Sequence, residues 1–175
     1  MRPESEDGLL LFNEDTGEAG GDFLSLAMSD GYVELVMEDG SGEVRCRGEQ
    51  RLELGLWHTV RVLREGGEVS LTVDAQTPVR VSQATGQTLS LASDLWLGGG
   101  TDSRGFKGCI KDLVINSLPV QLVASAVVTA NLDSCHTETS SHQPLSLHSL
   151  SPHHPVPAFS GQSYLAFNSS DVYTK

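Results

Sequence analysis

The sequence predicts an all-β fold, a sandwich of antiparallel sheets, and three observations support this class. Short apolar segments rich in β-branched and aromatic residues recur along the chain, and several alternate apolar and polar residues with a period of two. Turn signals separate these segments roughly every 8–12 residues, the spacing typical of a sandwich or barrel. No long segment has the periodicity of an amphipathic helix.

The first strands are expected on either side of two Gly-rich loops. The expected strands are Leu9–Phe12, Phe23–Met28 and Tyr32–Met37. Asn13–Gly21 is the first loop and Glu38–Gly42 the second. Asp30-Gly31 predicts a hairpin turn between the second and third strands, because this dipeptide readily adopts positive φ.

A second hairpin is predicted in the middle of the chain, from Trp57–Arg64 and Val69–Asp74 with a turn at Glu65–Glu68. In its first strand, Trp57, Thr59, Arg61 and Leu63 point one way, and His58, Val60, Val62 and Arg64 point the other. The residues expected in the core are Trp57, Val60, Val62, Leu71, Val73 and Leu97. Leu95–Leu97 and Cys109–Ile115 are further strand candidates, and Ala124–Ala130 fits a strand or a loop.

Charge and hydropathy narrow the function classes. The 175 residues carry 11 Lys and Arg against 23 Asp and Glu, a formal net charge of -12. This balance disfavours general binding to nucleic acid or anionic membranes and suits a cation, a basic partner or simple solubility. No apolar run reaches the ~18 residues of a membrane helix. The acidic, polar N-terminal segment is not a signal peptide, so a secreted parent would contain this chain as an internal piece.

The cysteines and histidines give no strong metal signal. Cys46, Cys109 and Cys135 form neither a CxxC nor a zinc-finger spacing. Their odd number in a secreted chain predicts one pair plus a free thiol, or an intermolecular bond. Residues 136–157 have the Ser-, His- and Pro-rich composition of a linker. Its irregularly spaced histidines raise a metal-binding alternative that no Cys or carboxylate cluster supports; they are His142, His148, His153 and His154.

The chain ends on a second apolar segment. Phe159–Phe167 reads as a β-strand that follows the linker. Asn168-Ser169-Ser170 is an N-glycosylation sequon, which matters only in a secreted chain.

Eight short sequence motifs, in order, resemble the laminin G-like (LNS) family of laminin α chains, perlecan, agrin, neurexins and crumbs-type proteins. They cover about three quarters of the chain, from Gly8 to Cys135. The motifs are DGLLLF from Asp7, GDFLSL from Gly21, DGYVEL from Asp30, GSG from Gly40, LWHTV from Leu56, VSLTVD from Val69, LWLGG from Leu95 and GFKGCI from Gly105.

The resemblance implies a jelly-roll-like sandwich of two antiparallel sheets and an extracellular adhesion or recognition role without catalysis. The sequence likewise has no Gly-x-Ser-x-Gly elbow and no phosphate-binding loop. Implied partners are matrix or cell-surface proteins and glycans, such as dystroglycan-type or heparan sulfate ligands. The alternatives are a structural spacer without a ligand and, as a remote third, a carbohydrate-active enzyme that shares the architecture.

The resemblance also implies particular site residues. It pairs Cys109 with Cys135, a disulfide that contributes about 3 kcal/mol, and leaves Cys46 unpaired, as a semi-buried thiol or in an intermolecular bond. It places Ca²⁺ on the Asp22 carboxylate, the carbonyl of Asp39 or a neighbour, the Thr88 carbonyl and the Ser90 side chain. Ser90 departs from the Asp or Asn of the family pattern and removes a charge. The alternative is that no calcium ion binds and that Asp22 and Asp39 are solvated loop carboxylates.

A cluster of arginines suggests a second kind of ligand. Arg45, Arg47 and Arg51 could share an anionic group through their forked donors, in the way that some family members hold sulfated glycans. Five acidic residues lie among or beside them, so a solvated edge strand of mixed charge is the alternative.

Three units are expected: a laminin G-like domain over residues 1–135 without its first strand, a linker over 136–158, and the first strand of a following domain within 159–175. Phe159–Phe167 resembles the missing strand, Phe-x-Gly-x-x-Tyr-Leu. A second hypothesis is therefore that this segment returns to residues 1–135 and fills the vacant position, because an unpaired sheet edge is a template for a strand within reach.

Overall fold

The computed structural model describes residues 1–15, 21–82, 88–100, 104–135 and 156–169. Within these ranges every named element is a β-strand, and every pairing between named strands is antiparallel. The predicted all-β class is confirmed. No helix among the described residues has the length and apolar character to cross a bilayer.

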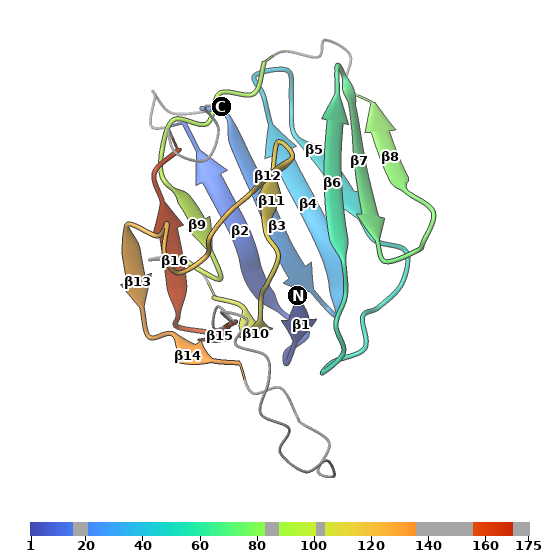
Figure 1. Ribbon diagram of the computed structural model, residues 1–175. Helices are drawn as coiled ribbons and strands as arrows, with labels where there is room; N and C mark the ends of the chain where they lie inside the picture. The colour runs from blue at the N-terminus through green and yellow to red at the C-terminus, as the bar shows by residue number, and fades with distance from the viewer. Residues whose placement is uncertain (16–20, 83–87, 101–103, 136–155, 170–175) are drawn as a thin grey trace.

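The largest sheet has seven strands in the order β13-β16-β9-β2-β3-β4-β5 (Figure 1). Its strands are β13 (Val128–Ala130), β16 (Tyr164–Phe167), β9 (Leu95–Leu97), β2 (Gly8–Glu14), β3 (Phe23–Ser29), β4 (Tyr32–Glu38) and β5 (Val44–Arg47). Because β13 and β16 come late in the sequence, this one sheet combines early and late strands of the described chain.

Three smaller sheets complete the fold. A four-stranded sheet has the order β1-β10-β15-β14, with β1 (Arg2–Pro3), β10 (Lys107–Cys109), β15 (Pro157–Ser160) and β14 (Asp133–Ser134). A three-stranded sheet contains β6 (Val60–Glu65), β7 (Glu68–Val73) and β8 (Val79–Ser82), and the pair β11 (Val114–Ile115) and β12 (Leu118–Pro119) forms the fourth sheet.

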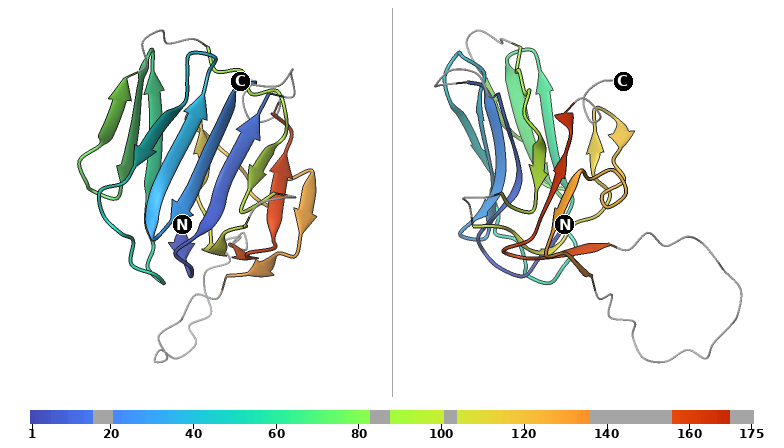
Figure 2. Two further views of the ribbon diagram at one scale, coloured as in Figure 1. Left: turned by 180° about the vertical axis from the view of Figure 1, so that it is seen from behind. Right: turned by 90° about the vertical axis from the view of Figure 1, so that its left-hand side faces the viewer.

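A single apolar core lies between the layers. The β6–β8 sheet and the β11–β12 hairpin lie on the same side of strands β2–β5 (Figure 2). Buried residues from all parts of the chain form one cluster, including Leu35 of β4, Leu71 of β7, Leu97 of β9 and Phe167 of β16. The expected jelly-roll-like sandwich is therefore present, with its hydrogen bonding divided among a large sheet and smaller ones.

The predicted hairpins form as their turn residues require. Asp30 and Gly31 both have positive φ, at 50° and 79°, and Ser29 pairs with Tyr32 across the turn. Glu65 pairs with Glu68 across the second turn. Alternation in β6 follows the predicted phase, with Arg61 and Leu63 exposed while Val60 and Val62 are half-buried against the core. Of the other expected core residues, Leu71, Val73 and Leu97 are buried.

Trp57 is the exception among the expected core residues, because 37% of it is exposed. It has the same parity as Arg61 and Leu63, so it belongs to the outward face, and β6 begins only at Val60. Its ring lies 4.6 Å from the Lys111 ammonium and 5.8 Å from the Arg2 guanidinium. Trp57 is therefore a surface platform for two cations rather than a core residue.

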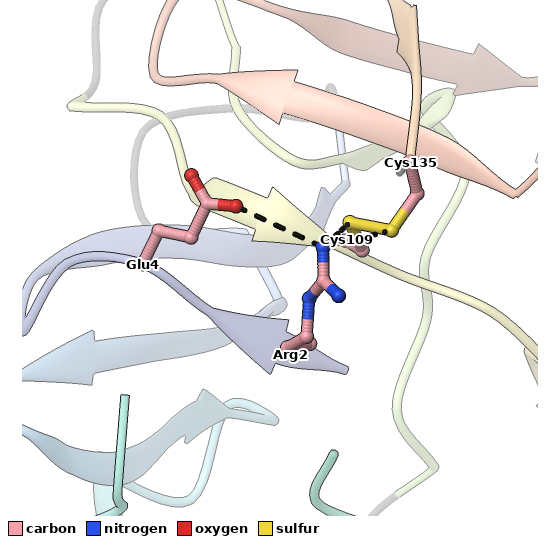
Figure 3. Close-up of a disulfide and its surroundings, with 4 residues drawn as sticks. All are labelled: Arg2, Glu4, Cys109 and Cys135. Carbon is pink, nitrogen blue, oxygen red and sulfur yellow. Dashed lines mark hydrogen bonds and ion pairs between the residues drawn. A yellow bond between two sulfur atoms is a disulfide. The ribbon is translucent and has the colours of Figure 1, made fainter. Parts of the chain in front are cut away.

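The expected disulfide joins Cys109 and Cys135, whose Cα atoms are 5.8 Å apart. The guanidinium of Arg2 contacts both sulfur atoms at 3.3 Å and lies 4.0 Å from the Glu4 carboxylate (Figure 3). Cys46 is buried and free, and burial raises the pKa of its thiol, which keeps the thiol protonated and unreactive.

Segment 156–167 pairs with residues 1–135. Strand β15 lies between β10 and β14, and β16 lies between β9 and β13. This is the arrangement of the second hypothesis, in which the segment returns to residues 1–135, and the division of the chain into domains stays a prediction. Asn168 of the sequon is exposed directly after β16. Residues 136–155, with the four histidines considered as metal ligands, lie outside the described residues.

Candidate functional site

The residues predicted to bind Ca²⁺ gather at one end of the seven-stranded sheet. Asp22 directly precedes β3 and Asp39 directly follows β4, and Phe23 pairs with Glu38, so the two aspartates flank the open end of this hairpin. The backbone N–H of Ser90 donates a 2.6 Å hydrogen bond to Oδ2 of Asp22. This contact brings the segment of Thr88 and Ser90, both exposed, to the same rim.

The two aspartates differ in what their carboxylates can do. The Asp39 side chain is fully buried; it accepts hydrogen bonds from the backbone and hydroxyl of Ser41 and forms an ion pair with Arg64 of β6. Asp22 is only half-buried at the rim. Of the two carboxylates, only that of Asp22 remains available to a cation at this rim, and the Asp39 carbonyl stays a predicted ligand.

The donor set fits a calcium ion in type but is weak in charge. Carboxylate, carbonyl and hydroxyl oxygens are hard ligands of the kind that Ca²⁺ prefers. Among the described residues, no group of three or more His, Cys, Asp or Glu side chains is placed to share a metal ion. A set with one carboxylate does not require such a group, but its affinity is expected to be low, since ligand charge tunes calcium affinity.

The arginines predicted to hold an anion are each engaged by acidic side chains. Arg45 forms ion pairs with Glu34 and Glu43, each at 3.1 Å, and these hydrogen bonds raise the pKa of its guanidinium. Arg51 pairs with Glu6 at 3.0 Å. Arg47 lies 3.8 Å from Asp30 and stacks 4.5 Å above the Tyr32 ring. The structure thus matches the alternative of a mixed-charge surface.

His58 has a structural position, with both of its ring nitrogens in hydrogen bonds. Its Nδ1 lies 2.8 Å from Asp74 Oδ2 and its Nε2 lies 2.9 Å from the Glu53 carbonyl. Partial burial alone would raise the pKa of Asp74, but the hydrogen bonds from His58 and the Thr59 amide outweigh it and lower that pKa. This cluster closes the start of the β6–β7 hairpin, where the Asp74 amide also donates to the Thr59 carbonyl.

A family model for the laminin G domain matches residues 1–118. The chain belongs to the laminin G domain family. This laminin G domain is 33% identical to the basement membrane-specific heparan sulfate proteoglycan core protein of Mus musculus, over 78% of the chain and 4% of that protein. It is also 29% identical to pikachurin of Bos taurus, over 98% of the chain and 20% of that protein, and 29% identical to neurexin-2 of Mus musculus, over 73% and 8%.

Two solved structures agree with the fold. Domains LG4–5 of the mouse laminin α1 chain match with a TM-score of 0.52 and 25% identity, over 57% of this chain and 26% of that one. The LG1–3 region of the laminin α2 chain matches with a TM-score of 0.56 and 22% identity, over 67% and 22%. The laminin G domain described here spans a fifth or less of the length of the curated relatives that it matches.

The Asp39–Arg64 ion pair is the feature of this rim that sequence reasoning missed. In the alternation of β6, Arg64 lies on the same inward face as Val60 and Val62. A cation on a buried face requires an acidic partner. The alternation pattern therefore predicts an acidic partner for Arg64, but it does not identify Asp39 among the many acidic residues of the chain. Burial alone would raise the pKa of Asp39; the hydrogen bonds from Ser41 and the Arg64 charge outweigh it and hold that pKa below its usual value.

Acid is expected to lower the free energy of unfolding of the laminin G domain, in part because Asp39 becomes protonated. Because the folded-state pKa of Asp39 is depressed, its stabilisation is complete above the unfolded value of about 3.9 and is lost as pH falls through the lower folded value. Asp39→Asn should lower the free energy of unfolding at pH 7 by about 2–3 kcal/mol, since Arg64 loses the carboxylate of this ion pair but keeps some contact with water. In the Asp39→Asn variant, the free energy of unfolding should also fall less steeply below pH 4. The measurement is urea unfolding from pH 7 to pH 2. An unchanged acid profile would contradict this role for Asp39.

Proposed function

We propose that this chain is an extracellular, non-catalytic recognition module that binds a matrix or cell-surface partner, a protein or a glycan, at the rim around Asp22. The observation that carries the proposal is the convergence of Asp22, Asp39 and Ser90 at one end of the sheet. The relatives support an extracellular context, since one of them is by name a basement membrane-specific proteoglycan core protein.

Calcium is the proposed cofactor of this surface. It would be held by the Asp22 carboxylate, with oxygens from Asp39, Thr88 and Ser90. The ion would add positive charge to an acidic chain and so favour an acidic ligand group beside it. A sulfated glycan bound by the arginines alone has less support, because Arg45, Arg47 and Arg51 already pair with acidic side chains.

Calcium is expected to raise the melting temperature of the chain, because a ligand that binds only the folded state stabilises it. Asp22→Asn should abolish most of this rise, since Asn keeps an acceptor for the Ser90 amide but removes the charge. Ser90→Asp should strengthen the response by supplying a second carboxylate. The measurement is a thermal shift in millimolar Ca²⁺ against chelator, with Asp133→Asn on exposed β14 as the charge-matched control. An equal calcium response in Asp22→Asn and the parent chain would remove this site.

The alternative function is a structural spacer with no ligand of its own. A glycan array and a binding assay with dystroglycan-type glycoprotein, each in calcium and in chelator, separate the two functions. Binding that Asp22→Asn weakens supports recognition at the rim, and absence of binding in every condition supports the spacer. Asn168, exposed at the end of β16, is the proposed glycosylation acceptor.

A further inference from the structure

Strands β15 and β16 occupy interior positions in two sheets. Leu165, Ala166 and Phe167 of β16 pair with β9 on one side, and Val128–Ala130 of β13 pairs with β16 on the other. Strand β15 lies between β10 and β14 in the same way. All four flanking strands belong to residues 1–135, so removal of the β15–β16 pair would open a strand-wide slot in each sheet.

The side chains of this pair form part of the main core. Phe159 is buried, and Leu165, Ala166 and Phe167 are fully buried. Two aromatic contacts join the pair to the remainder of the chain: Phe159 lies 6.4 Å from Phe106, and Tyr164 lies 5.2 Å from Trp96, between ring centroids. The slot is therefore apolar, and without its occupant it would expose this part of the core to water.

Glycines make room for the pair along its path. A Cβ at Gly98 would lie 2.0 Å from the Phe159 ring, and φ at Gly98 is +81°. A Cβ at Gly99 would lie 3.1 Å from the Ser163 carbonyl oxygen, and one at Gly105 would lie 2.7 Å from that of Gly161. Because a Cβ at Gly98 or Gly105 would collide with the pair and one at Gly99 would be tightly packed against it, the slot is complementary in shape to this particular segment.

The walls of the slot are linked independently of their occupant. The Cys109–Cys135 disulfide connects β10 to the residue that follows β14, and these are the two strands that flank β15. At the turn between β15 and β16, the Asn131 side chain donates to the Gln162 carbonyl and the Ser163 hydroxyl donates to the Asn131 carbonyl. The disulfide thus holds one end of the slot, and Asn131 holds the turn.

The described residues on either side of residues 136–155 are neighbours in the structure. The backbone N–H of Cys135 donates a 2.8 Å hydrogen bond to the carbonyl of Val156, so these two residues, 21 positions apart in the sequence, lie side by side. The connection has no distance to bridge, and its cost is only the entropy of loop closure. A tether of roughly 20 residues gives its end an effective concentration on the order of millimolar, which favours occupation by the same chain at micromolar protein.

We propose that residues 1–135 form a peptide-binding slot and that this chain fills it in cis with its own residues 156–167. The occupant is a docked strand pair, which is held by β-augmentation on both sides and by buried side chains that include Phe159, Leu165 and Phe167. The other possible occupant, the same segment of a second copy, would form a swapped dimer.

A protease site placed within residues 136–155 tests the proposal on the full chain. After cleavage, the two pieces should elute together at the mass of one chain at micromolar concentration. Their melting temperature should then rise with protein concentration, while that of the uncut chain should not. In the cleavable chain, Phe167→Asp should release the C-terminal piece on cleavage, while the matched change Asn168→Asp at the exposed next position should not.

Two results would overturn the proposal. Separation of the cleaved pieces without a change in the melting of the larger piece would show that the pair does not belong to the fold. A dimeric mass for the uncut chain at micromolar concentration, with a concentration-dependent melting temperature, would assign the slot to a second copy.

A shortened connection provides a test that does not depend on a disruptive substitution. Replacing residues 136–155 with a four-residue Gly/Asn turn should keep the chain monomeric and raise its melting temperature by about 3–6 °C, because the loop to be closed is shorter. A loss of about 10 °C or more, or a shift to a dimer, would contradict filling in cis.

Discussion

Leu71→Ala is expected to lower the free energy of unfolding by about 2–5 kcal/mol, because the substitution leaves a cavity in a close-packed core. Leu71 is 1% exposed at the centre of β7, where it pairs with Val62 of β6. The measurement is urea unfolding at neutral pH. Leu63→Ala on the outward face of the same hairpin is the matched control, with an expected change below about 1 kcal/mol. Equal effects at the two positions would show that the assignment of the faces is wrong.

Reduction of the Cys109–Cys135 disulfide is expected to lower the free energy of unfolding by about 3 kcal/mol, chiefly because the unfolded chain gains freedom. The comparison is denaturant unfolding with and without a phosphine reductant. A Cys109→Ser, Cys135→Ser double variant should be as unstable as the reduced parent and insensitive to reductant. This control separates the effect of losing the disulfide from any effect of the reductant at Cys46, which is already a free, buried thiol. Equal stability of the oxidised and reduced parent would mean that the bond does not restrain the unfolded chain.

The local elements of the fold were predictable because their signals are local. The Asp30-Gly31 dipeptide specified a turn with two positive φ values, and the period-two pattern after Val60 specified which face of the β6–β7 hairpin is buried. The prediction that Trp57 lies in the core was wrong, because Trp57 alternates in phase with the exposed Arg61 and Leu63 and not with Val60 and Val62. At the surface, the Trp57 ring makes cation–π contacts with Arg2 and Lys111. Both residues are distant in sequence, so no local pattern predicts these contacts.

The non-local features were harder to predict. The approach of Ser90 to Asp22 came from family resemblance, and no periodicity in the sequence indicates it. The pairing of Asp39 with Arg64 crosses from one sheet to another, so it depends on tertiary packing that the sequence pattern does not encode. For segment 156–167, the apolar pattern predicted a strand but not its neighbours. An apolar strand at the end of a long connection can pair equally well with a sheet edge of its own domain or of another domain.

The adjacent ends of residues 136–155 have a mechanical consequence. Tension applied through the segment after β16 would act first on β16, which must shear from β9 and β13 together. Its release, with β15, would lengthen the chain by residues 136–167, about 110 Å at full extension. The Cys109–Cys135 bond would then transmit the force directly to β10 and remove residues 110–134 from the load path. Release of β16 would also free β13, which pairs with the large sheet only through β16, while β9, β2, β3, β4 and β5 would remain paired.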